Sequence, residues 1–321
     1  MMKDAREEGN VSPQAMRVLK AVELVSHMPK IGHMAQNGEL RKRFTAMEHA
    51  WNIPEGLALE NVALSNSRLE WLSPTEELLV KPAVLQLHGG GYYGTLHNTY
   101  RDMAALYQKL SGGIVASLDY RVAPQDLYPA ALEDAVEAYA YILAQGYQGQ
   151  EMIVVGDSAG GGLALALVMY LRDNRMPLPA GVITMSAWTD LSLSGESYTE
   201  NFNTDPMFGG STDTLIYHNE YPGTYDPREP YISPLYGDYK GFPPMLMQVG
   251  EREMLLSDTL EVARKAKIDG VRVKEQIYPG MFHVFQMGLS RFPESTHAWK
   301  EVRKFIREIY YGRNQFVSEV K

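Results

Sequence analysis

The 321-residue sequence contains no cysteine, which excludes disulfide bonds, cysteine nucleophiles and thiolate-bound metal sites. It also lacks any apolar run of the roughly 18 residues that a membrane-spanning helix requires. The first eight residues, MMKDAREE, lack the apolar core of a signal peptide. These absences predict a cytoplasmic protein without a membrane span.

The chain also has fewer basic than acidic residues. The chain carries 30 Lys and Arg against 39 Asp and Glu, a formal net charge of -9. An acidic surface repels phosphates, so we expect neither a nucleic-acid partner nor attraction to anionic membranes. The hydrophobic content of 45% and the charged content of 21% are those of a globular chain with a sizeable core.

What the chain does have is glycine in two clusters, of which the more informative is residues 156–162, GDSAGGG. An apolar run precedes it and a helical pattern follows it, so the cluster is predicted as a tight strand-to-helix turn with Ser158 at its tip. The pattern G-x-S-x-G is that of a nucleophile elbow. Side chains at Gly156 and Gly160 would clash where strand and helix close together. The competing interpretation is a turn whose serine only caps the helix.

The second glycine cluster, residues 88–92, ends the predicted strand 80–88. Bare glycines let backbone amides approach a ligand, and H-G-G-G is the known partner of G-x-S-x-G in lipases and esterases. Acyl transfer needs such amides to stabilise the developing oxyanion. The predicted oxyanion donors are the amides of Gly89, Gly90, Gly91 and Ala159. His88 is expected to orient this loop, and a phosphate loop is disfavoured because its characteristic spacings are missing.

A general base is expected in the loop after the last predicted strand. Of the eight histidines, His283 lies between the predicted strand 271–278 and the predicted helix 294–311. This position favours His283 as the base that activates Ser158.

The acid should follow the preceding strand, 244–249, because the order Ser…acid…His is typical of α/β-hydrolases. Glu251, Glu253 and Asp258 are the candidates. We select Glu253, with Asp258 as the alternative, because Asp258 resembles the cap of the next helix.

Along the chain, strand-like and helix-like segments alternate, which indicates a mostly parallel sheet with helices on both faces. The predicted strands are 59–64, 68–72, 80–88, 113–119, 152–156, 181–185, 244–249 and 271–278. The predicted helices are 98–111, 129–145, 159–174, 257–268 and 294–311, preceded by one helix that Ser12 caps and one after Asn37. Residues 190–240 form a long polar insert, predicted to be functional, with short helical pieces near 211–220.

Five motifs together resemble the hormone-sensitive-lipase family of α/β-hydrolases, in the branch with GDSAG at the elbow. They are HGGGY at 88–92, DYRVAP at 119–124, PAALED at 129–134, GDSAGG at 156–161 and PGMFH at 279–283. The resemblance covers about residues 79–311. It implies the α/β-hydrolase fold, with an eight-stranded, mostly parallel sheet flanked by helices and a helical cap. It also implies an esterase without metal or organic cofactor, and Gly90 and Gly91 as better oxyanion donors than Gly89.

The resemblance further divides the chain into an N-terminal helical cap segment, 1–55, and a catalytic domain, 56–321, whose insert 190–240 completes the cap. Family members usually carry Asp in a D-x-L-x-D-E run at the acid position, where this chain has Glu253. A homodimer is a further possibility that the family suggests.

The predicted function is a serine carboxylesterase that hydrolyses short- to medium-chain acyl esters through Ser158, Glu253 and His283 and an acyl-enzyme intermediate. An amidase, a lactonase or a deacetylase would use the same residues. A non-catalytic small-molecule receptor on the same fold is the alternative from another class. Apart from the site, we expect Arg121 to pair with a carboxylate on the following helix, and Asp157 to accept hydrogen bonds that brace the loop.

Overall fold

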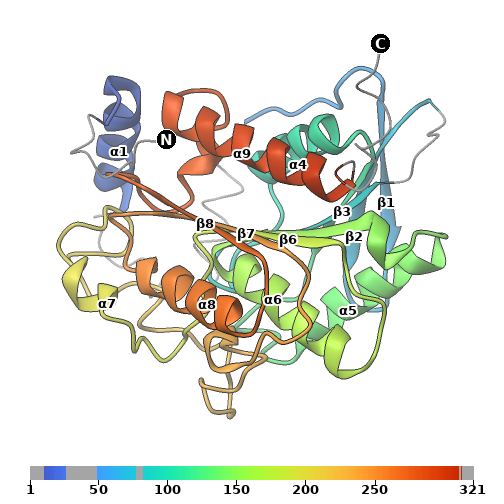
Figure 1. Ribbon diagram of the computed structural model, residues 1–321. Helices are drawn as coiled ribbons and strands as arrows, with labels where there is room; N and C mark the ends of the chain where they lie inside the picture. Colours follow the sequence, from blue (N-terminus) through green and yellow to red (C-terminus); the bar gives the residue numbers. More distant parts are fainter. Residues whose placement is uncertain (1–10, 27–48, 77–81, 311, 313–321) are drawn as a thin grey trace.

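The computed structural model describes residues 11–26, 49–76, 82–310 and 312. Within these ranges eight strands form one sheet, seen edge-on across the middle of Figure 1. The strands are β1 (Leu57–Ala63), β2 (Arg68–Pro74), β3 (Ala83–Leu87), β4 (Ile114–Asp119), β5 (Met152–Asp157), β6 (Gly181–Met185), β7 (Met245–Gly250) and β8 (Val273–Tyr278).

Helices cover both faces of this sheet, with α4 and α9 on one side and α5, α6 and α8 on the other (Figure 1). The α-helices are α1 (Pro13–Ser26), α4 (Asn98–Ser111), α5 (Ala130–Ala144), α6 (Ser158–Asp173), α7 (Ser197–Glu200), α8 (Leu256–Ile268) and α9 (Pro293–Tyr310). Short 3-10 turns are η1 (Gly149–Glu151), η2 (Pro234–Tyr236) and η3 (Phe285–Gly288). No helix in the described ranges combines the length and apolarity needed to cross a bilayer.

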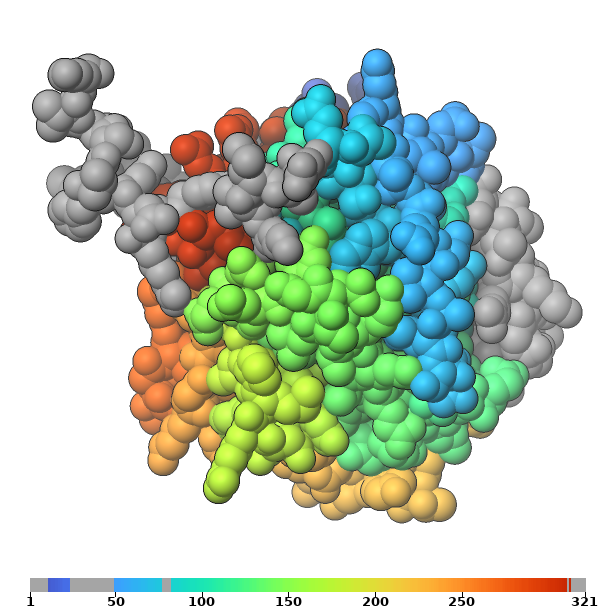
Figure 2. Space-filling view, turned by 90° about the vertical axis from the view of Figure 1, so that its right-hand side faces the viewer, coloured from blue at the N-terminus to red at the C-terminus, as the bar shows by residue number. Residues whose placement is uncertain are grey.

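The strand order is β1-β2-β4-β3-β5-β6-β7-β8. β1 pairs antiparallel with β2, β2 pairs antiparallel with β4, and every later pairing is parallel. The prediction of a mostly parallel eight-stranded sheet in an α/β fold is therefore confirmed. Figure 2 views the molecule from the β1 side, where the blue residues of the first hairpin form part of the surface.

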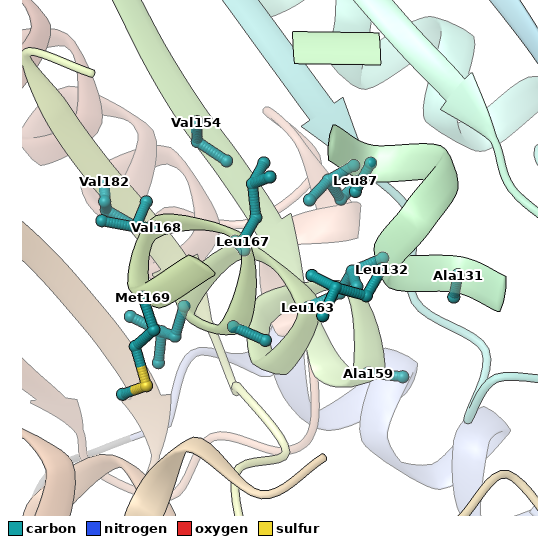
Figure 3. Close-up of a cluster of buried hydrophobic side chains, with 14 of the residues drawn as sticks. Leu87, Ala131, Leu132, Val154, Ala159, Leu163, Leu167, Val168, Met169 and Val182 are labelled. Carbon is teal, nitrogen blue, oxygen red and sulfur yellow. The ribbon is translucent and has the colours of Figure 1, made fainter. Parts of the chain in front are cut away.

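The central strands are apolar throughout because both of their faces are buried. In β5, Met152 and Val154 belong to the core under α5 and α6, whereas Ile153 and Val155 belong to the core under α4 and α9. Figure 3 shows the first of these cores, where side chains of α6 pack against the sheet. This two-sided packing holds the carboxyl end of β5, and hence Ser158, in a fixed position.

The N-terminal helix begins as predicted, with the Ser12 hydroxyl accepting a hydrogen bond from the amide of Ala15 at 3.1 Å. Its buried residues Ala15 and Leu19 join a small core with Met281 and Phe282, beside the predicted base. The second predicted helix, after Asn37, lies outside the described residues.

The insert 190–240 is mostly turns. The prediction of helical pieces near 211–220 is wrong, since the helical turns of the insert lie at Ser197–Glu200 and Pro234–Tyr236. Polar side chains compete for the backbone near 211–220: the Ser211 hydroxyl accepts from the Asp213 amide, and the Asn219 side chain accepts from the Tyr221 amide. Such local bonds favour turns over a continued helix.

Candidate active site

The carboxyl ends of β3, β5, β7 and β8 meet at one edge of the sheet, because these strands run parallel to one another. Every predicted site residue follows one of these ends. The loop of His88 follows β3, Ser158 follows β5, Glu253 follows β7 and His283 follows β8. The parallel arrangement thus brings together residues that lie up to 195 positions apart in the chain, from 88 to 283.

Ser158 is the first residue of α6 and has a backbone φ of +52°, in the left-handed region that non-glycine residues rarely adopt. The elbow is as tight as its glycines predict. A Cβ on Gly156 would lie 2.2 Å from the carbonyl oxygen of Gly160, and a Cβ on Gly160 would lie 2.2 Å from that of Leu87. Both contacts are impossible for a real side chain, so the turn requires glycine at each position.

His283 and Glu253 form a buried pair, with Nδ1 of the imidazole 2.9 Å from Oε2 of the carboxylate. Glu253 is fully buried and His283 is only 5% exposed. The other carboxylate oxygen accepts hydrogen bonds from the Ser186 hydroxyl, at 2.7 Å, and from the Gly250 amide. Because the carboxylate accepts the proton on Nδ1, Nε2 of the neutral ring can serve as a base.

Ser186 joins the two loops that carry this pair. Its hydroxyl donates to Glu253 and accepts from the Val284 amide at 3.0 Å. The residue has a φ of +51° and directly follows β6. Ser186 was not among the predicted site residues, although its place at the carboxyl end of a parallel strand is a signal that could have identified it.

The other two candidate carboxylates contact different parts of the chain. Asp258 accepts the amides of Thr189 and Asp190, at 2.6 and 2.8 Å. Burial raises the pKa of Asp258 to about 8, against the opposing effect of these hydrogen bonds. Glu251 accepts the Gly280 amide at 2.9 Å. Among the hydrogen bonds of the described residues, only Glu253 of the three contacts His283.

In each peptide group of the glycine loop, either the N–H or the C=O is held by a hydrogen bond. The Gly89 amide donates to the Tyr100 hydroxyl at 2.8 Å, so it is already engaged. The Gly89 carbonyl lies 2.8 Å from Nδ1 of His88, which donates to it. Because the N–H and C=O of a trans peptide point in opposite directions, this bond turns the Gly90 amide away from His88.

The amides of Gly91 and Ala159 are oriented in the same way, by a hydrogen bond to the carbonyl of the preceding residue. The Gly90 carbonyl accepts from the amides of Tyr93 and Gly94, at 3.0 and 2.9 Å, which turns the Gly91 amide to the other side. The Ser158 carbonyl accepts from the Trp188 amide at 2.9 Å, which does the same for Ala159. The hydrogen bonds of the described residues leave the amides of Gly90, Gly91 and Ala159 without an acceptor.

Aromatic side chains fix His88 and its loop. The imidazole stacks on the Tyr120 ring with centroids 4.1 Å apart, and the Tyr120 hydroxyl donates to the His88 carbonyl at 2.6 Å. His88 therefore orients the loop, as predicted. Next to Ser158, Asp157 accepts from the Tyr100 hydroxyl at 3.1 Å and so has the predicted bracing role.

The predicted partner of Arg121 is also confirmed. Its guanidinium binds both carboxylate oxygens of Asp134, with the closest contact at 2.8 Å, and reaches Glu133 at 3.1 Å. Both acids lie on α5. The pairing fixes the segment that follows β4 to this helix, behind the glycine loop.

A cavity of about 360 Å³ borders Ser158, His283 and the three loop glycines. Its apolar wall is formed by Met207, Phe208, Leu215, Val284 and Met287. Its polar wall includes His49, Thr95, His97, Asn98 and Thr99. Burial lowers the pKa of His97 to about 4, so this ring is neutral at pH 7.

These lining residues were not predicted from the sequence, because they come from separate loops, the start of α4, η3 and the insert. Trp51, an aromatic residue near the start of the described chain, packs against the core under α4 and α9 and does not border this cavity. A larger cavity of about 560 Å³ lies between the ends of α6 and α8 and the insert. None of the predicted site residues borders it, and Arg172 on its wall is paired with Asp173 and Asp238.

A family model described as alpha/beta hydrolase fold matches residues 84–287. The chain is 33% identical to an acetyl-hydrolase of Streptomyces hygroscopicus over 292 residues, which are 89% of this chain and 96% of the relative. It is also 33% identical to an esterase of Acinetobacter venetianus over 226 residues, 70% of this chain and 75% of that protein.

Solved structures agree with this picture. The esterase EstE5, in a crystal soaked with p-nitrophenyl butyrate, superposes with a TM-score of 0.84 and 33% identity, covering 93% of this chain and 99% of its own. An esterase from the bacterial hormone-sensitive lipase family also gives a TM-score of 0.84 and 33% identity, covering 94% of this chain and 99% of its own.

Proposed function

This chain belongs to the hormone-sensitive-lipase family of α/β-hydrolases, and on that basis we propose that it is a serine carboxylesterase with Ser158 as nucleophile, His283 as base and Glu253 as acid. One observation carries the proposal. His283, which is hydrogen-bonded to the buried Glu253, borders the same cavity as a serine held at a φ of +52°. The curated relatives and solved neighbours named as esterases support the reaction class.

In the first half-reaction, Nε2 of His283 takes the hydroxyl proton of Ser158 while Oγ attacks the ester carbonyl carbon. Glu253 holds the ring in the required tautomer and stabilises its charged form. The imidazolium then gives its proton to the departing alkoxide, which leaves as the alcohol. Water, activated by the same base, hydrolyses the acyl-enzyme to the acid and regenerates Ser158.

The amides of Gly90, Gly91 and Ala159 stabilise the tetrahedral oxyanion. This assignment is supported by the hydrogen bonds that the carbonyls of Gly89, Gly90 and Ser158 accept. Each bond fixes one peptide group, so its N–H is already oriented before the substrate binds. Such prearranged donors cost no reorganisation during the reaction. Gly89 is left out because its amide already donates to Tyr100.

The substrates are esters with short to medium acyl chains. Two observations support this size. The cavity of about 360 Å³ is near the lower end of the range for small-molecule sites. Relatives include an acetyl-hydrolase of Streptomyces hygroscopicus and an ethyl acetate hydrolase of Pseudomonas putida.

The insert 190–240 acts as part of a cap over Ser158. It supplies Met207, Phe208 and Leu215 to the apolar wall, and these side chains come from a segment outside the sheet. His49 is the described residue of the segment 1–55 that borders the cavity, and the catalytic domain 56–321 supplies the rest. Acyl length is therefore set mainly by the insert.

The test is a series of p-nitrophenyl esters from acetate to palmitate, assayed with the wild type and with Ser158→Ala. We expect kcat/KM to peak between acetate and hexanoate, and the variant to lose essentially all turnover. Hydrolysis by Ser158→Ala at the wild-type rate would exclude the proposed nucleophile. A peak at palmitate would exclude the proposed chain length.

A further inference from the structure

Three side chains of the insert bind the backbone of the loop that carries Glu253. The Ser197 hydroxyl donates to the Met254 carbonyl at 2.6 Å. The Asn201 amide group donates to the carbonyls of Glu251 and Glu253, at 3.0 and 2.8 Å. The acid is thus held by a segment about 50 residues earlier in the chain.

Asp205 is the third of these side chains and has an unusual environment. It is 3% exposed, and its carboxylate accepts three backbone amides. One oxygen accepts from Met207 and Phe208, at 2.7 and 3.1 Å, and the other accepts from Met254 at 2.7 Å. A buried carboxylate with such donors makes strong, charge-assisted hydrogen bonds. Asp205 therefore joins the cavity wall to the residue next to Glu253.

The turn that Asp205 holds also contacts the base. The Phe208 ring lies edge-on to the His283 ring, with centroids 4.8 Å apart and an angle of 64° between the planes. Phe208 is 6% exposed, so it excludes water from this side of the imidazole. The same turn is closed by Gly209, where a Cβ would lie 2.3 Å from the Phe202 carbonyl oxygen.

We propose that Asp205 is a positioning residue for catalysis, which sets the geometry of the Glu253–His283 pair from the insert. The inference rests on the proposed function and deepens it. Through Met254 it fixes the backbone of the acid loop, and through Phe208 it fixes the face of the imidazole that is turned toward the cavity wall. The insert 190–240 thereby contributes to proton transfer as well as to substrate binding.

The decisive variant is Asp205→Asn, which keeps the side-chain shape but replaces one acceptor oxygen with an NH₂ group. That group would face a backbone N–H, so one side of the bridge must open. Glu200→Gln is the matched control, since it removes one negative charge from an exposed residue of the same segment.

With p-nitrophenyl butyrate, we expect Asp205→Asn to lower kcat by about 10- to 100-fold while KM changes less than about threefold, in line with effects of disturbed catalytic geometry. The acid limb of the kcat/KM profile should move to lower pH, because a loosened Glu253 stabilises the imidazolium less. The control should keep the wild-type kcat and pH profile. A wild-type kcat in Asp205→Asn, or a rise in KM alone, would overturn the inference.

Phe208→Leu keeps the test valid if Asp205→Asn does not fold. It retains an apolar side chain and all three hydrogen bonds of Asp205, and should also lower kcat and displace the acid limb. An unchanged acid limb in a folded Phe208→Leu protein would contradict the role assigned to this turn. Failure of the proposed function is separate, because it would appear as full activity in Ser158→Ala.

Discussion

Two loops of the site perform different tasks and are held in different ways. The glycine loop, residues 88–94, is anchored at His88 and Gly89 by its own His88 ring, by Tyr100 of α4 and by Tyr120 after β4. Asn219 of the insert adds a hydrogen bond to the Gly91 carbonyl at 2.7 Å. The acid loop, residues 250–258, is fixed by side chains of the insert, among them Asp205. The insert therefore contacts both loops. In the glycine loop the bonds at His88 and Gly89 come from residues beside the sheet, whereas in the acid loop the insert binds the backbone at and next to Glu253.

The difference explains why one loop can be identified by pattern and the other cannot. Amides that face an oxyanion need bare backbone, and only glycine provides it at positions such as Gly90, with its φ of +107°. A catalytic carboxylate, by contrast, requires only that the histidine lie within hydrogen-bonding distance, and this leaves no pattern in the neighbouring sequence. Glu253 and Asp258 are both buried, and the partners that distinguish them, His283 and the Thr189 amide, lie 30 and 69 residues away in the chain.

The largest effect is expected in the acid loop, from Glu253→Gln compared with Asp258→Asn. Glu253→Gln should lower kcat by about 10³-fold or more, because the amide cannot support the imidazolium or the correct tautomer. Asp258→Asn should keep kcat within about threefold and lower the free energy of unfolding by about 1–3 kcal/mol, since it disturbs buried hydrogen bonds. Ester-hydrolysis kinetics measure kcat, and urea unfolding measures the free energy of unfolding, for both variants. Loss of turnover in Asp258→Asn but not in Glu253→Gln would make Asp258 the catalytic acid.

The next effect tests the glycine loop through Gly90→Ala. The new Cβ would lie 2.7 Å from Cα of Gly94, so the loop must move and the oxyanion donors with it. We expect kcat to fall by about 10²-fold, the typical cost of losing one donor. Gly56→Ala is the control, because Gly56 also has a positive φ, +78°, but open space around it. Equal kcat values for the two variants would argue against oxyanion donors in this loop.

The last effect concerns stability instead of turnover and involves Asp157, which braces the glycine loop. Burial raises its pKa to about 7 from 3.8, partly opposed by the hydrogen bond from Tyr100 and by the nearby His283. A carboxyl group with a raised folded-state pKa contributes stability that is full below about pH 4 and is lost as pH rises toward 7. The loss amounts to about 4 kcal/mol at most.

Asp157→Asn should remove this dependence, so its free energy of unfolding should fall less between pH 5 and pH 8 than that of the wild type. Urea unfolding at the two pH values measures it. The exposed Asp226→Asn serves as the control and should retain the wild-type slope. Parallel slopes for the wild type and Asp157→Asn would show that the carboxyl group does not titrate in this range.

Much of the fold follows from local pattern. The eight predicted strands occur within a few residues of their predicted bounds. Two-sided burial makes inner strands such as β3, β5, β6 and β7 largely apolar runs, whereas β1 and β8 are only partly buried. The conformation of the insert was not predictable in the same way, as the wrong prediction of helical pieces near 211–220 shows. Its conformation depends on hydrogen bonds between polar side chains and backbone, for which the sequence has no periodic signal. The assignments of a homodimer and a cytoplasmic location stay predictions.

By itself, the sequence determined the elements that local sterics control: the elbow at Ser158, the bare loop at residues 88–94 and the order of strands and helices. Tertiary structure decided which carboxylate contacts His283, which peptide groups of the loop are anchored, and which insert residues border the cavity. The physical reason is the separation along the chain between the atoms that interact. A clash at Gly156 involves atoms four residues away, whereas the environment of Glu253 is assembled from Ser186, Asn201 and His283, which only the folded chain brings together.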